Sequence, residues 1–116
     1  MAGYTELDET TIRGLYGDDR ALIGDLVQLF EQQVDEYAAW CNAVQQPDLP
    51  ILADKAHKLK GSVAALGMLK LQETTRLLVQ QAKANDSPAD CLEQAKALLP
   101  RLRKALQELR FYHDNQ

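Results

Sequence analysis

The segment "AHKLKGSVAALG", residues 56–67, combines residue types and spacing that could do chemistry. On a helix of about 100° per residue, His57, Lys60 and Gly61 fall on one face at steps of three and four. A neutral imidazole, the main form at pH 7, is a nucleophile, and a phosphorylated ring nitrogen is a reactive phosphoryl donor. Lys60 adds a positive charge that can meet an anionic group. Because phosphoryl transfer is mostly positioning and charge stabilisation, these residues meet the minimum needs of a phosphoryl relay.

Gly61 is unusual because a glycine in the middle of a helix costs about 1 kcal/mol relative to alanine. A Cβ at this position would crowd the flank of the imidazole. Its absence, with Ala64 one turn further on, leaves room for a partner to approach the ring. Two alternatives remain open from spacing alone: the glycine could permit close helix packing, and a lone surface histidine often has no function. Ser62 does not lie on the helix face that carries the histidine, so we expect it to have a structural role.

Apolar residues recur at steps of three and four along nearly the whole chain, and no stretch shows sustained alternation, so helices are expected throughout. A short helix is predicted after Asp8, a plausible N-cap, with Gly14 or Gly17 near its end. A long amphipathic helix is predicted over residues 18–44. Its apolar stripe comprises Leu22, Leu26, Phe30, Val34, Tyr37, Cys41 and Val44.

The third predicted helix contains the histidine. Asp48 can cap its start, Pro50 is tolerated in its first turn, and Gly67 can close it. Its core stripe comprises Leu52, Ala56, Leu59, Val63 and Leu66. Since His57 lies away from that stripe, its side chain is expected to be substantially exposed.

A fourth helix is predicted over roughly residues 69–84, and a fifth begins at Ser87 with a signal like a capping box. Pro100 is expected to kink the fifth helix or to force a short break. The 116 residues are enough for one domain with one core. The expected fold is therefore all-α, an up-down-up-down four-helix bundle with a short extra N-terminal helix as a lid, in a single domain over residues 1–116.

Charge is distributed unevenly along the chain. Residues 1–50 hold ten acids and two bases, whereas residues 51–70 hold one acid and four lysines, namely Lys55, Lys58, Lys60 and Lys70. The net charge of −4 argues against a nucleic-acid partner. The local basic patch around His57 suits an acidic protein partner or a transferred phosphate.

Several other classes of function are disfavoured. No apolar run approaches the roughly 20 residues of a membrane span, and the start "MAGYTELDET" is too acidic for a secretory signal. Cys41 and Cys91 lie far apart and are expected to be buried, reduced thiols of a cytosolic protein. There is no glycine-rich phosphate loop, and no metal-binding helical pair accompanies His57 or His113, so neither an ATP site nor a metal site is expected.

The motif around the histidine closely resembles the signature of histidine phosphotransfer (HPt) domains of bacterial phosphorelays. It reads His57-Lys58-Leu59-Lys60-Gly61-Ser62, followed by Leu66-Gly67. The shared features are the histidine and, counted in residues after it, an apolar residue at two, a lysine at three, a small residue at four and a glycine at ten. It extends over most of the chain, from "LD" before the first helix through "LIGDLVQLF" to "LKLQETTRLLVQQAK".

The resemblance implies that His57 is the phosphorylated residue, that Lys60 stabilises the phosphoryl group and that Gly61 keeps the site open. Several family members carry a polar side chain from the next helix near the histidine, about 22 residues after it. Here that position is Val79, with Gln80 beside it. A hydrogen bond from that helix to the imidazole is therefore in doubt.

The expected partners are the receiver domain of a hybrid sensor kinase and that of a response regulator. The acidic faces of these receivers would meet Lys58 and Lys70, and Ala64 would lie in the contact beside the histidine. The family likeness adds two apolar contact residues of the short first helix, Ile12 and Leu15. A module of this type would use no ATP of its own and bind no cofactor. The receiver would bring the aspartate and Mg²⁺.

We expect a cytoplasmic monomer that binds neither nucleic acid nor membrane. Two other functions remain open: a non-catalytic helical adaptor whose histidine is incidental, and a pseudo-HPt that binds receivers without relaying. The initial methionine and the length favour a free-standing protein over an excised domain.

Overall fold

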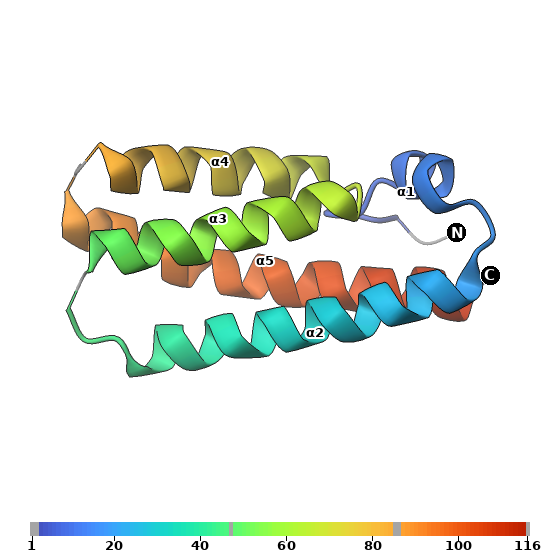
Figure 1. Cartoon of the computed structure of the whole chain (residues 1–116), viewed down its shortest axis with the longest axis horizontal. Helices are drawn as coiled ribbons and strands as arrows, with labels where there is room; N and C mark the ends of the chain where they lie inside the picture. The colour runs from blue at the N-terminus through green and yellow to red at the C-terminus, as the bar shows by residue number, and fades with distance from the viewer. Residues whose placement is uncertain (1–2, 47, 85–86, 116) are drawn as a thin grey trace.

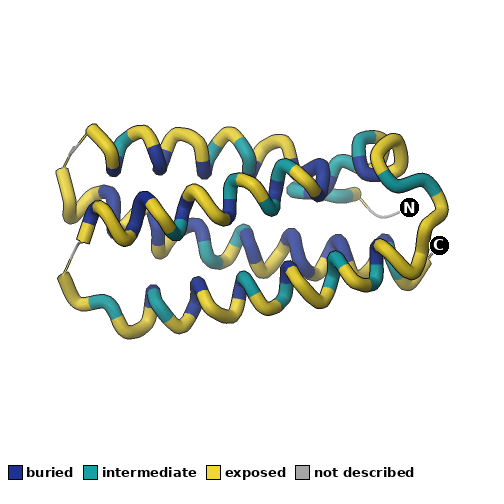
Figure 2. The backbone as a smooth tube through the Cα atoms, viewed as in Figure 1, coloured by how far each residue is buried: buried dark blue, intermediate teal, exposed yellow. Residues whose placement is uncertain are grey.

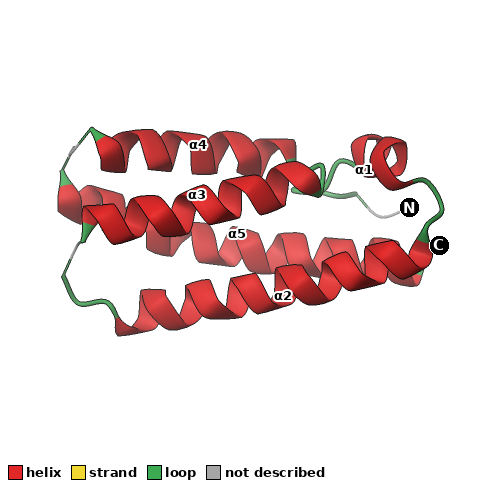
Figure 3. Ribbon diagram, in the orientation of Figure 1, coloured by secondary structure: helices red, strands yellow, loops and turns green. Residues whose placement is uncertain are grey.

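Helices make up all the regular structure in the part of the chain that is described. The computed structural model describes residues 3–46, 48–84 and 87–115, and within these ranges it has five helices and no strand (Figures 1 and 3). Their bounds are α1 (Glu9–Tyr16), α2 (Arg20–Ala43), α3 (Leu49–Ala65), α4 (Leu69–Lys83) and α5 (Pro88–Asp114). The all-α expectation is confirmed.

The four long helices run alternately up and down along one shared axis, and α1 lies at the end of the bundle where α3 finishes (Figure 1). The closest pairings are α3 with α4 and α2 with α5. This arrangement is the expected up-down-up-down bundle with a short helix as a lid at one end. It presents one long side of α3 to solvent (Figure 2).

Aspartates start three of the helices, because their carboxylates accept hydrogen bonds from backbone N–H groups that have no partner inside the helix. Asp8 accepts from Thr11, Asp19 from Leu22 and Asp48 from Ile51. Two of these caps, Asp8 and Asp48, were predicted from the sequence. Ser87 precedes α5, but its side chain makes no capping hydrogen bond, so the capping box expected there is wrong.

Of the kink or short break expected at Pro100, the break does not occur, since α5 continues through the proline from Pro88 to Asp114. A proline inside a helix removes the hydrogen bond to the carbonyl four residues earlier, here that of Lys96. Both Pro100 and Lys96 are exposed, so water can hydrate that carbonyl. Packing of α5 against α2 and α4 holds the helix together on either side of the proline.

The core lies between the inner faces of the helices (Figure 2). All five apolar residues of the predicted α3 stripe are buried. On α2 the predicted stripe begins one residue too early, since Leu22 is 39% exposed whereas Ile23 is fully buried. Ile23 lies seven residues before the buried Phe30, about two helical turns, so these two share a face. Both cysteines are buried, as expected.

Gly67 ends α3 and permits close contact with α1. Its φ of +71° lies in the left-handed region, and a Cβ there would lie 3.0 Å from Thr11 Cγ2 and 3.2 Å from the Ile12 nitrogen. We therefore expect Gly67→Ala to lower the free energy of unfolding by roughly 1–3 kcal/mol, measured by urea denaturation.

Gly14→Ala is the matched control for Gly67→Ala. Gly14 lies inside α1, and a Cβ there would meet no atom within 4 Å. Alanine should leave the stability unchanged or raise it by up to about 1 kcal/mol. Equal effects of the two substitutions would show that the α1–Gly67 contact does not constrain the end of the bundle.

Candidate functional site

His57 lies in the middle of α3 with its side chain exposed, as the stripe predicted. The neighbouring residues Ala56 and Leu59 are buried and fix the orientation of this face. Within the described ranges no side chain forms a hydrogen bond or an ion pair with the imidazole. Both ring nitrogens are therefore available to a group that approaches from outside the bundle.

Gly61 is one turn beyond His57 and is exposed. A Cβ placed on it would meet no atom within 4 Å, apart from the backbone of its own helix and its chain neighbours. No neighbouring helix uses the glycine for close packing, which removes one of the two alternatives that the spacing left open. The expectation that a Cβ would crowd the imidazole is therefore wrong, because no imidazole atom lies within 4 Å of that position, and the bundle gives no steric reason for glycine here.

Lys60 and Ala64 are half-buried on the side of α3 that carries His57. Lys60 forms no ion pair with any carboxylate in the described segments, so its charge is not neutralised within the bundle. Ser62 is turned away and donates a hydrogen bond from Oγ to the carbonyl of Lys58 at 3.2 Å, which agrees with the structural role predicted for it.

The position on α4 where the family likeness suggests a polar neighbour of the histidine is occupied by valine. Val79 is 7% exposed and belongs to the core, while Gln80 is exposed. Since Val79 has no hydrogen-bonding group, it cannot orient the imidazole. Within the described residues, neither side chain forms a hydrogen bond with the imidazole.

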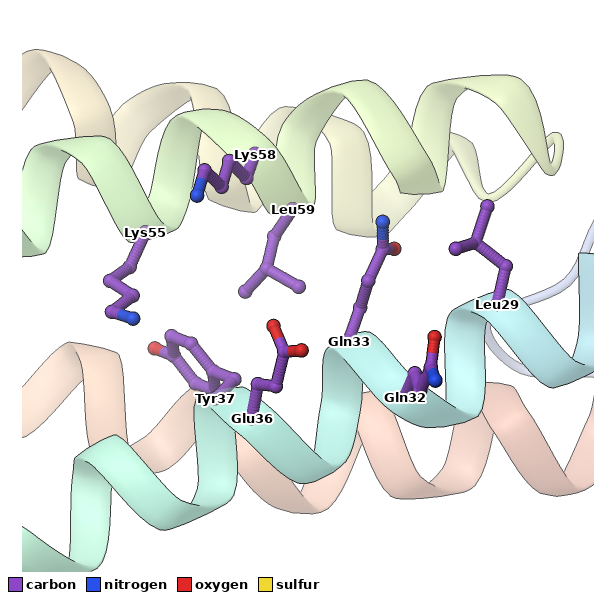
Figure 4. Close-up of a pocket in the computed structure, with 8 residues that line it drawn as sticks. All are labelled: Leu29, Gln32, Gln33, Glu36, Tyr37, Lys55, Lys58 and Leu59. Atoms are coloured by element: carbon purple, nitrogen blue, oxygen red, sulfur yellow. The ribbon is translucent and has the colours of Figure 1, made fainter.

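A groove runs between α2 and α3, and it comprises two adjoining hollows that share Leu29, Gln33 and Lys58. The first, shown in Figure 4, has lysines from α3 on one side and polar side chains from α2 on the other. The second is lined mainly by apolar groups and includes Gly61 and Ala65. We call both hollows together the α2–α3 groove. Through Gly61 it reaches the helix face next to His57.

The two partner contacts predicted on α1 differ in how far the side chains are exposed. Ile12 is fully buried, so it cannot contact a partner directly, and that prediction is wrong. A short amphipathic helix must bury an apolar residue to be held on the bundle, and Ile12 is that residue. Leu15 is 54% exposed and can still contribute to a contact. Lys58 and Lys70 are exposed, as their predicted roles require.

Sequence analysis missed two parts of this surface. Leu29 is 51% exposed at the junction of the two hollows, and it follows the exposed Leu22 at a spacing of seven, a second stripe that could have been noticed. The Tyr16 hydroxyl donates a hydrogen bond to the carbonyl of Ala65, which fixes α1 to the end of α3. No local pattern signals that contact.

Comparison with known proteins identifies the family. The model of the Hpt domain matches residues 25–111, which span most of the chain and include His57, whereas no curated protein and no solved structure matches. The chain therefore belongs to the Hpt domain family and has a phosphotransfer role in a two-component phosphorelay. Members of this family interact with receiver domains. None of the described helices is long and apolar enough to span a membrane.

Proposed function

We propose that His57 accepts a phosphoryl group from the phospho-aspartate of a hybrid sensor kinase's receiver domain and passes it to the aspartate of a response regulator. A neutral ring nitrogen attacks phosphorus, an N–P bond forms, and the bond from phosphorus to the aspartate oxygen breaks. The second transfer reverses these steps on the other receiver. The observation that carries the proposal is the exposed His57 beside Gly61, where no neighbouring helix covers the helix face.

Lys60 is proposed to stabilise the phosphoryl group. Lys60 follows His57 by about one turn of α3, and its ammonium is not neutralised by a carboxylate of the described residues. A positive charge held there favours the transferring group, whose negative charge is spread over three oxygens. The chain itself needs no cofactor in this proposal, because the receiver would bring Mg²⁺ with its aspartate.

The receiver is proposed to dock on α3 and the α2–α3 groove. Leu29 and the apolar hollow beside Gly61 offer surface that can be buried in a complex. Lys55 and Lys58 line the other hollow and can attract the acidic active face of a receiver. All these residues come from one chain, so a monomer suffices, and the exchange would take place in the cytoplasm, where kinases have ATP.

The two lysine roles can be separated by substitution. We expect Lys60→Ala to lower the transfer rate at saturating receiver by about tenfold, corresponding to roughly 1.4 kcal/mol of barrier, with little change in affinity. Lys55→Ala should instead weaken binding, with an effect that shrinks at high salt because exposed charges are screened. The measurements are single-turnover transfer and receiver affinity, at low and high salt. Identical behaviour of the two variants would contradict a role for Lys60 at the phosphoryl group.

The experiment that tests the proposed function is incubation with a panel of phosphorylated receiver domains from the same organism. At least one receiver should lose its phosphoryl group to the protein, and the phosphorylated protein should then load a second receiver without added nucleotide. A protein that binds receivers but takes up no phosphoryl group would be a pseudo-HPt. One that binds none would be an adaptor of another kind.

A further inference from the structure

Glu108 is a buried carboxylate on α5 that the proposed phosphotransfer chemistry does not use. The residue is only 5% exposed. Burial of a charged group is costly unless hydrogen bonds or an opposite charge compensate. Its position on α5 is far along the chain from the segment that it contacts, so it connects two distant parts of the sequence.

The compensation comes from the segment that leads into α1. Glu108 Oε2 accepts hydrogen bonds from the Thr5 nitrogen and hydroxyl, both at 2.9 Å, and Oε1 accepts from the nitrogens of Glu6 and Leu7, also at 2.9 Å. Three consecutive backbone N–H groups thus converge on one carboxylate, an arrangement that favours an anion. Burial opposes ionisation of Glu108, but these hydrogen bonds outweigh it and lower its pKa.

A second connection strengthens the same segment. Arg101, two turns before Glu108 on α5, donates to both carboxylate oxygens of Glu6 at 2.9 Å. It also donates to the Thr74 hydroxyl of α4 at 2.8 Å. We call Thr5–Leu7 with Glu108 and Arg101 the N-terminal clamp. It attaches the segment before α1 to two helices of the bundle.

The clamp and the far end of α1 together fix where that helix lies. Immediately after the clamp, the Asp8 nitrogen donates to the carbonyl of Gly67, and at the other end Tyr16 donates to the carbonyl of Ala65. Ala65 also lines the apolar hollow of the α2–α3 groove. The end of α1, which carries the exposed Leu15, is therefore attached to a residue that lines the proposed docking surface. The family match at residues 25–111 does not include this segment, so it assigns the segment no role.

We propose that Glu108 is a positioning residue for receiver docking, which acts through the N-terminal clamp and α1 and never touches the phosphoryl group. This inference rests on the proposed function. In this proposal, α1 completes the docking surface only when the N-terminal clamp holds the segment that precedes the helix. Phosphorylation of His57 by a donor too small to dock should not depend on the clamp.

Glu108→Gln tests the proposal, because one of the two acceptor oxygens becomes an NH₂ group that faces N–H donors. We expect the KM for a phosphorylated receiver to rise about tenfold, with the rate at saturation unchanged. Phosphoramidate should label His57 at the wild-type rate; in that reaction the donor's P–N bond breaks, ammonia leaves and an N–P bond forms on the imidazole. Amide hydrogen exchange should accelerate over residues 5–16 and not in α3.

Glu93→Gln is the matched control, an exposed carboxylate on the same helix, and it should change none of these readouts. Arg101→Gln should also raise the receiver KM, by a smaller factor than Glu108→Gln. If Glu108→Gln fails to fold, the receiver KM of Arg101→Gln tests the proposal in its place. An unchanged receiver KM, despite faster exchange in residues 5–16, would overturn the proposal. The proposal would also be overturned if Glu108→Gln slowed phosphorylation equally with a receiver and with phosphoramidate as the donor. A wild-type protein that phosphoramidate and every receiver fail to label would instead contradict the proposed function itself.

Discussion

Replacing His57 with glutamine is expected to abolish phosphoryl uptake and leave the bundle folded. A glutamine amide nitrogen is not a nucleophile, so no N–P bond can form. The side chain of His57 is exposed and makes no hydrogen bond or ion pair with the described residues, so its loss should change the free energy of unfolding by no more than about 0.5 kcal/mol. The measurements are label transfer from a phosphorylated receiver and urea denaturation.

His113→Gln is the control for His57→Gln, since His113 is the other histidine of the chain. Its ring packs on α2, where Nε2 lies 3.1 Å from the place of a Cβ on Gly24, and Nδ1 lies 3.2 Å from Asp114 Oδ1. It lies near the C-terminal end of the chain, whereas His57 lies near the middle, and its substitution should leave labelling unchanged. Undiminished labelling of the His57→Gln protein would show that another residue accepts the phosphoryl group.

Substitutions of Gly61 are expected to have the second largest effect, and their direction depends on size. Gly61→Gln places a long side chain next to the imidazole and should slow transfer from a receiver about tenfold or more, without loss of stability. Gly61→Ala should stabilise the protein by up to about 1 kcal/mol, because the added Cβ meets nothing within 4 Å and a helical glycine is removed.

The test for Gly61 is to measure transfer and unfolding on the same preparations of both variants. If a receiver phosphorylated the Gly61→Gln protein at the wild-type rate, the docked partner would have to leave this face uncovered. That result would contradict the proposed docking geometry. Destabilisation by both alanine and glutamine would show that the glycine serves the helix rather than the partner.

Features that depend on residues within one or two helical turns could be predicted from the sequence. The caps Asp8 and Asp48 each contact a nitrogen only three residues further on. The exposure of His57 follows from the apolar stripe of its own helix, and the end of α3 at Gly67 follows from the backbone freedom of glycine. The motif around the histidine is equally local, so its likeness to the family is visible in the sequence alone.

Features that depend on contacts between distant segments could not be predicted. Glu108 contacts Thr5 across 103 positions, and nothing in either local sequence marks the pair. Ile12 and Leu15 are both apolar, and only packing against the bundle decides that the first is buried and the second exposed. Pro100 suggested a kink or a short break, and the helix does not break there because tertiary contacts on both sides outweigh the one hydrogen bond that the proline removes.

The central claim is that this chain carries a phosphoryl group on His57 between two receivers. The most direct measurement is to load the wild-type protein from a phosphorylated receiver and to locate the phosphoryl group by mass spectrometry of peptides kept at alkaline pH. We predict one phosphoryl group, on His57, stable in base, lost in acid and discharged by addition of a second, unphosphorylated receiver. A phosphoryl group on any other residue, or one that survives acid and is not passed on, would contradict the account.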